Sequence, residues 1–195
     1  MKLKSIAFAV AVLATAVGAQ AGSGHVSQNG GGLSPVLATG TSANPYLLGS
    51  LDTSFSSVFV TISGAGSFSE FATFTVPAGF NMVNGAANTY ALNITLPFFG
   101  LITIGSVSSF NMAIKGGTPA APSSTFANVS AGGSVTNLAL APGNYHLKFT
   151  GATNGAGGQY SAALNALPVP EPETYAMFLA GLGALGFLAR RRKNA

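Results

Sequence analysis

The chain has 195 residues, of which 48% are hydrophobic and only 6% are charged, with a formal net charge of +4 and no cysteine. Without disulfides, a folded domain must rely on a hydrophobic core, and the length is sufficient for one domain. Six of the eight basic residues lie in the first four and last six positions, so the positive charge belongs to the chain ends and does not indicate a nucleic-acid partner.

Residues 1–21 have the three parts of a secretory signal peptide. Lys2 and Lys4 form a basic start, residues 6–18 are apolar, and Ala19 and Ala21 fit a small-x-small cleavage site. A buried N-terminal helix is the alternative, but no polar face alternates with the apolar run. We therefore expect a mature chain that starts near Gly22.

Residues 22–49 are rich in Gly, Ser, Asn and Pro, and we expect them to form a partly ordered leader or a first edge strand. From residue 50 to residue 167, short β-branched and aromatic runs alternate with turn residues, and no helical periodicity is sustained. The clearest strand spans 89–96, where Tyr90 and Leu92 share the inward face with two further apolar residues.

The other expected strands span 55–62, 68–76, 100–104, 107–114, 125–129, 135–140, 145–150 and 160–165. Each offers one apolar face. This pattern favours an all-β fold, a single antiparallel β-sandwich or jelly-roll domain, over a parallel sheet with crossover helices.

The segment 22–167 contains four charged residues, which are Asp52, Glu70, Lys115 and Lys148. Glu70 has the same strand parity as Phe68 and Phe74, which directs its carboxylate toward the core, where a charge needs a partner. We expect it at a sheet edge, bonded to turn backbone or solvent. The alternative is that Glu70 and Asp52 are weak metal-site candidates, although calcium takes about six to eight oxygen ligands.

The two histidines do not suggest catalysis. His25 lies in the expected leader and His146 on the expected polar face of strand 145–150, so both are interpreted as surface residues. The sequence offers no plausible set of nucleophile, base and orienting group. We expect no enzyme activity, no cofactor and no metal ion.

Residues 168–195 contain three features in a fixed order. Val169, Pro170, Glu171, Pro172 and Glu173 come first, an apolar helix is predicted over 175–189, and Arg190, Arg191, Arg192 and Lys193 form a basic stop, expected in the cytoplasm. The helix would be about 22 Å long against a hydrocarbon core of about 30 Å, which suits a transient membrane stop. An ordinary C-terminal membrane helix is the alternative.

This tail resembles the PEP-CTERM sorting signal of Gram-negative bacteria. In that family, a membrane enzyme called exosortase is expected to cut near the Pro-Glu-Pro and to release or transfer the protein outward. The resemblance implies export across the inner membrane, transient anchoring through 175–189 and an exosortase-like partner.

Two further segments resemble the FxDxF group of PEP-CTERM proteins. They are Phe68-Ser-Glu-Phe-Ala-Thr-Phe-Thr-Val76 and the hairpin 140–151. Glu70 stands where the pattern has Asp, and Ala72 where it has the second Phe. The resemblance implies a small secreted jelly-roll-like domain and supplies no biochemical role.

Together these features predict a secreted, non-enzymatic protein at the outer surface, or in the extracellular polysaccharide matrix, of a Gram-negative bacterium. Polar strand faces with almost no charge suit contact with a hydrated neutral polymer such as an exopolysaccharide. A calcium- or carbohydrate-binding module that uses Asp52 and Glu70 is the alternative, and a hydrolase comes third.

Overall fold

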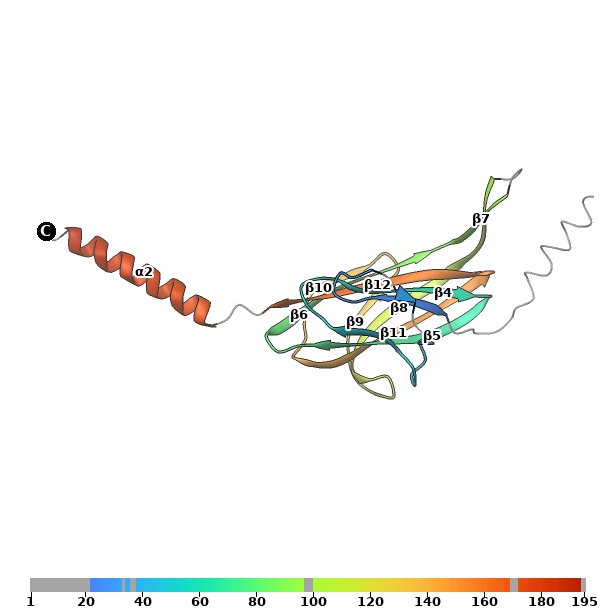
Figure 1. The fold of residues 1–195 in the computed structure, drawn as a ribbon, viewed down its shortest axis with the longest axis horizontal. Helices are drawn as coiled ribbons and strands as arrows, with labels where there is room; N and C mark the ends of the chain where they lie inside the picture. Colours follow the sequence, from blue (N-terminus) through green and yellow to red (C-terminus); the bar gives the residue numbers. More distant parts are fainter. Residues whose placement is uncertain (1–21, 33, 36–37, 97–99, 169–171, 194–195) are drawn as a thin grey trace, which may run out of the picture.

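The computed structural model describes residues 22–32, 34–35, 38–96, 100–168 and 172–193. Two six-stranded sheets pack face to face, and one helix follows them along the chain (Figure 1). The prediction of an all-β sandwich with a C-terminal helix is confirmed. Ala19, Ala21, Val169, Pro170 and Glu171 lie outside the described residues.

Sheet I has the strand order β10-β6-β12-β4-β1-β2, and all its pairings are antiparallel. Its strands are β1 (Ser23–Ser27), β2 (Ser34–Pro35), β4 (Ser56–Ser63), β6 (Phe80–Tyr90), β10 (Ser134–Ala139) and β12 (Gly157–Pro168).

Sheet II has the order β3-β5-β11-β8-β7, with β9 also paired to β8. Its strands are β3 (Tyr46–Ser50), β5 (Gly66–Val76), β7 (Leu92–Leu96), β8 (Gly100–Thr118), β9 (Ala121–Ser130) and β11 (Gly143–Gly155). Among the strands that the structure describes, only β3 and β5 pair in parallel.

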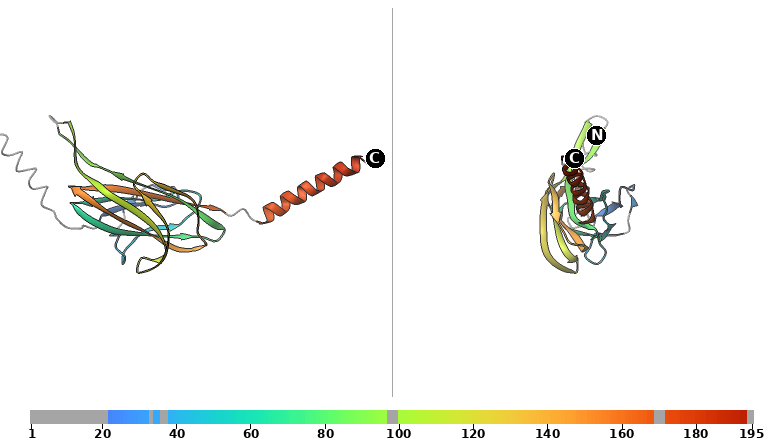
Figure 2. Two further views of the ribbon diagram at one scale, coloured as in Figure 1. Left: turned by 180° about the vertical axis from the view of Figure 1, so that it is seen from behind. Right: turned by 90° about the vertical axis from the view of Figure 1, so that its left-hand side faces the viewer.

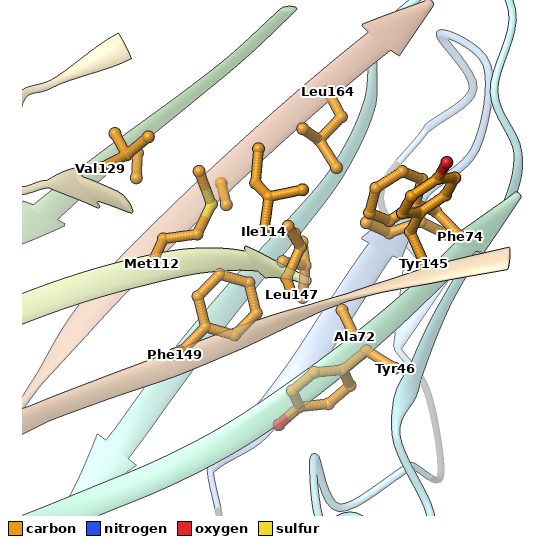
Figure 3. Close-up of a cluster of buried hydrophobic side chains, with 14 of the residues drawn as sticks. Tyr46, Ala72, Phe74, Met112, Ile114, Val129, Tyr145, Leu147, Phe149 and Leu164 are labelled. Carbon is orange, nitrogen blue, oxygen red and sulfur yellow. The ribbon is translucent and has the colours of Figure 1, made fainter. Parts of the chain in front are cut away.

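The core lies between the inner faces of the two sheets, because apolar residues alternate with polar ones along the central strands. The alternation predicted for β5, β11 and β12 is confirmed, with Phe74, Leu147 and Leu164 all buried. Figure 3 shows these side chains meeting in the interior, and the right-hand view of Figure 2 looks along the two layers. Each large apolar side chain buried here contributes about 1.5–3 kcal/mol.

The segment 22–49, expected as a partly ordered leader or a first edge strand, supplies β1, β2 and most of β3, of which β2 and β3 are edge strands. β1 lies inside sheet I between β4 and β2, and Val26, Tyr46 and Leu48 belong to the core. The sandwich therefore begins at Ser23 and not at residue 50. The strand β1 reads Ser-Gly-His-Val-Ser, which has one large apolar residue and is too short to show a period.

The strand predicted over 89–96 is split between the two sheets. β6 ends at Tyr90 in sheet I and β7 begins at Leu92 in sheet II, so the chain changes sheets at Ala91. Tyr90 is 44% exposed, contrary to its predicted inward position, and Val83 and Ala87 face the core from β6. The strands expected at 100–104 and 107–114 are one strand, β8, whose first part projects with β7 beyond the sandwich (Figure 1).

The helix α2 spans Pro172–Lys193, which is longer than the predicted 175–189. Proline suits its first position because the missing N–H has no partner there. The helix points away from the sandwich in Figure 1, and Met177, Phe178 and Leu179 are each more than 60% exposed. Among the described residues, no helix combines the length and the apolar character needed to span a membrane.

Candidate functional site

Glu70 is buried between the two sheets and joins them. Its strand, β5, belongs to sheet II, while both of its hydrogen-bond donors belong to the sheet I side. The backbone N–H of Gly22, just before β1, donates to Oε1 at 2.6 Å, and the hydroxyl of Tyr160 on β12 donates to Oε2. Only 3% of Glu70 is exposed, so the prediction of a sheet-edge position is wrong.

A second tyrosine completes this buried cluster. Tyr46 on β3 donates its hydroxyl to the Gly22 carbonyl oxygen at 3.2 Å. Burial raises the pKa of Glu70, while the hydrogen bonds from Tyr160 and Gly22 lower it. Burial and the neighbouring carboxylate raise the pKa of both tyrosines, which therefore remain hydrogen-bond donors at neutral pH.

Asp52 lies far from Glu70. Its Oδ1 accepts a hydrogen bond from the Ser54 N–H at 2.7 Å, and its main-chain oxygen accepts one from the Ala166 N–H. Ala166 and Tyr160 lie six positions apart on β12, a separation of about 20 Å along a strand. The structure therefore does not bring the two carboxylates together, and no group of three metal-ligating side chains occurs within the described residues.

His146 is buried, with 1% exposed, although the sequence suggested a surface position. It lies on β11 between β5 and β8, where its Nδ1 is 3.0 Å from the Gly117 oxygen and its ring is 6.2 Å from that of Phe71. Burial lowers the pKa of His146, and the charges of Lys115 and Lys148 lower it further, while the Gly117 bond raises it. His25 is half-buried on the outer face of sheet I, so the two histidines do not meet.

The outer face of sheet I carries an aromatic pair, in which Tyr90 is 44% exposed and Phe59 is half-buried. Phe59 on β4 and Tyr90 on β6 have ring centroids 5.9 Å apart. The strand register places them in two adjacent rows of side chains, Thr61-Gln159-Tyr90 and His25-Phe59-Ser161-Asn88. We call these residues the neutral face, because the six strands of sheet I contain no Asp, Glu, Lys or Arg.

Hydrogen bonds order the polar side chains of the neutral face. The Gln159 amide donates to Thr61 Oγ1 at 3.3 Å, and the hydroxyls of Tyr90 and Ser161 are 3.3 Å apart. Sequence reasoning missed this surface because it placed Tyr90 in the core. Only the cross-strand register brings together residues that are up to 136 positions apart in the chain, from His25 to Ser161.

The outer face of sheet II is different because it carries both lysines of the sandwich. Lys115 lies on β8 and Lys148 on β11, and the Lys148 Nζ is 6.0 Å from the ring centroid of Phe71. Since Glu70 points inward, this face is positive although the four charges of the sandwich sum to zero.

A shallow groove of about 440 Å³ opens at one end of sheet II. Its polar lining residues are Gln28, Thr73, Thr75, Thr118 and Asn144. The Thr75 hydroxyl donates to Asn144 Oδ1 at 2.9 Å, so part of this polar lining is already satisfied internally.

The C-terminal segment matches a family model. Residues 168–193 match the PEP-CTERM protein-sorting motif. The chain carries a PEP-CTERM sorting motif. The match confirms the identity of the predicted sorting tail, and it does not extend to the segments 68–76 and 140–151 that resemble the FxDxF group.

No curated protein matches this PEP-CTERM chain. Three solved structures are similar to its sandwich: TmCBM61 in complex with β-1,4-galactotriose, the pre-peptidase C-terminal domain of a collagenase from Bacillus anthracis, and PliG, a periplasmic inhibitor of g-type lysozyme from Aeromonas hydrophila.

The three similarities are weak. The sequence identities are 14%, 13% and 13%, and the TM-scores are 0.31, 0.37 and 0.32. The alignments cover 58%, 63% and 63% of this chain, and 71%, 95% and 99% of the respective structures. At these values the resemblance is one of strand arrangement and carries no argument about function.

Proposed function

We propose that this protein is exported, held transiently at the inner membrane by its tail, processed by an exosortase-like enzyme, and then binds uncharged polysaccharide outside a Gram-negative cell. It acts by binding and not by catalysis. The PEP-CTERM motif at 168–193 supports the sorting steps. The observation that carries the binding step is the Phe59–Tyr90 pair on a face without charged residues.

The chemistry of the neutral face suits a sugar ring. A pyranose presents C–H groups on its flat faces and hydroxyl groups at its rim. Aromatic rings offer an apolar surface to the C–H groups. The amide of Gln159 and the hydroxyls of Thr61 and Ser161 are able to donate and accept hydrogen bonds, as sugar hydroxyls require.

The distribution of charge favours an uncharged polymer at this site. An acidic polysaccharide is attracted to the lysines, which lie on the outer face of sheet II, and gains nothing from the neutral face. A neutral polymer is not attracted to the lysines, so the shape of the surface and contact with aromatic rings determine where it binds. The neutral face is therefore the surface on which we expect it to bind.

Affinity electrophoresis of the full chain in gels that contain an uncharged polysaccharide tests this proposal. Dextran, galactan, xylan and mannan cover different linkages, and alginate serves as an acidic comparison. We expect at least one uncharged polymer to retard the protein, and the variant Phe59→Ala/Tyr90→Ala to lose most of this retardation, on the order of tenfold in affinity.

Phe126→Ala is the matched control, because Phe126 is 43% exposed on sheet II, close to the 44% of Tyr90. It should bind as the wild type does. If no uncharged polymer retards the wild type, or if Phe126→Ala weakens binding as much as the double variant, the proposal is wrong. Loss of binding in Asn144→Ala alone would move the site to the groove.

A further inference from the structure

We infer that Glu70 is a binding site for the chain's own mature amino terminus, the α-ammonium group that cleavage after Ala21 creates on Gly22. This inference rests on the export step of the proposed function, through the expected cleavage after Ala21, and does not depend on the polysaccharide binding. It gives the buried carboxylate a cationic partner that the sandwich itself lacks.

The register of sheet I fixes the position of Gly22. β1 pairs with β4 from Ser23 to Ser27, and Gly22 directly precedes it with the same parity as the buried Gly24 and Val26, which places Gly22 on the inward side. There the Gly22 nitrogen lies 2.6 Å from Glu70 Oε1, and the Gly22 carbonyl oxygen accepts the hydroxyl of Tyr46. Gly22 is itself buried.

Any residue other than glycine at this position would have to displace its neighbours. A Cβ added to Gly22 would lie 2.3 Å from Val60 Cγ1, 2.8 Å from Glu70 Oε1 and 2.9 Å from Ile62 Cδ1. The residue that becomes the amino terminus is thus the one whose nitrogen touches the carboxylate and whose lack of a side chain allows the approach.

Cleavage changes the chemical nature of this contact. Hydrolysis of the Ala21–Gly22 peptide bond consumes one water molecule, leaves Ala21 as a carboxylate and leaves the Gly22 nitrogen as a protonated primary amine. Before cleavage, a neutral amide N–H donates one hydrogen bond to Glu70. After cleavage, a full positive charge occupies the same point.

The side chains around Glu70 determine how strongly the ammonium charge affects the stability of the fold. The other titratable side chains that face it are Tyr46 from β3 and Tyr160 from β12, and neither supplies a positive charge. Burial disfavours the ionised carboxylate, and an adjacent ammonium favours it. Since an unpaired buried charge is strongly destabilising, we expect the mature chain to be more stable than the precursor.

The test compares three chains that all extend to Ala195 and are kept in detergent. One begins at Gly22 with a free amine, released from a cleavable fusion. The second is the same chain with an acetylated amine, which restores the neutral amide. The third begins at Ala21, which displaces the ammonium by about 3.8 Å. Each is made with the wild-type sequence and with Glu70→Gln.

We expect the free Gly22 chain to melt on the order of 10 °C above the acetylated chain, and this difference to disappear in Glu70→Gln. Its α-amine should react with an acylating reagent at least tenfold more slowly than that of the Ala21 chain, with Lys148 as an internal reference amine. If Glu70→Gln does not fold, the melting and acylation comparisons in the wild-type sequence decide.

Equal melting temperatures for the free and acetylated wild-type chains would overturn the inference, as would equal acylation rates for the Gly22 and Ala21 chains. Neither result bears on polysaccharide binding, which depends on the opposite, outer side of sheet I. The two proposals therefore fail independently.

Discussion

Glu70 and His146 are both buried in this sandwich, and each relies on a main-chain group for a hydrogen bond. Glu70 accepts from the Gly22 N–H between the sheets, and His146 contacts the Gly117 oxygen on the outer face of sheet II. Burial penalises the charged form of both, which raises the pKa of the carboxyl and lowers that of the imidazole. Their titrations consequently affect stability in opposite directions.

For His146, stability should fall on acidification. The unfolded imidazole binds a proton near pH 6.5, whereas the folded one resists it, so its contribution is present above pH 6.5 and is lost as the pH falls through the lower folded pKa. We expect the melting temperature of the wild type to drop more between pH 7 and pH 5 than that of His146→Gln. His25→Gln, on the other side of the sandwich, should follow the wild type. Parallel pH profiles for the wild type and His146→Gln would contradict this.

Calcium should not stabilise the protein through Glu70. Both oxygens of Glu70 already accept hydrogen bonds. Asp52, which accepts a hydrogen bond from the Ser54 N–H, lies far from Glu70. Calcium takes about six to eight oxygen ligands, and these two side chains do not supply them. We expect calcium to leave the melting temperature of the wild type and of Glu70→Gln unchanged. A rise with calcium concentration in the wild type that is absent from Glu70→Gln would restore the calcium-binding alternative.

Residue parity alone predicts part of the Glu70 site. The alternation of β5 directs Glu70 inward with Phe68 and Phe74, and the structure confirms this direction. The partners were not predictable, because Gly22 and Tyr160 lie 48 and 90 positions away and approach from the other sheet. A single strand pattern contains no information about which element packs against it.

At the level of elements, alternation predicts strands well when a strand stays in one sheet. β11 and β12 keep one face buried along their length, and both were predicted with the correct face. The run 89–96 alternates just as clearly, but the chain leaves sheet I and joins sheet II within it. Periodicity continues through such a crossing, so it cannot locate the crossing or assign the buried face beyond it.

This crossing changes the expected effect of substitutions. Val83 on β6 is fully buried, and Val83→Asp places an unpaired charge in the core, so we expect loss of the cooperative melting transition. Leu92 lies half-buried at the start of the projecting β7, and Leu92→Asp should cost only about 1 kcal/mol in the free energy of unfolding.

Asn93→Asp, at an exposed position, is the control for added charge on β7 and should melt like the wild type. Chemical denaturation of the three variants measures the difference. If Leu92→Asp is as damaging as Val83→Asp, the face that the sequence suggested for 89–96 is the correct one.

In the whole molecule, the two expected processing sites lie at the two ends of the sandwich sequence. β1 begins at Ser23, one residue after the Gly22 that the expected cleavage at Ala21 makes the first residue, and β12 ends at Pro168, where the PEP-CTERM match begins. The tail was predictable because its three features are local and ordered along the chain. The neutral face was not, since it exists only through the register of β1, β4, β12 and β6.

This layout predicts the composition of the mature protein. Cleavage within 168–173 removes the helix without disrupting sheet I, because the pairing of β12 with β6 ends at Pro168. The exposed apolar side chains of α2 lose no contact with the core when the helix leaves. We therefore expect the intact mass of the protein recovered from its host to fit a chain from Gly22 to a residue within 168–173. A chain that ends at Glu173 should melt within about 2 °C of the full chain.

Replacing Glu171 and Pro172 by Ala, within the sorting motif, should cause the unprocessed chain to accumulate. If every chain recovered from the wild type still contains 175–189, the tail is a permanent anchor, because a sorting signal that is never removed keeps the protein attached to the membrane.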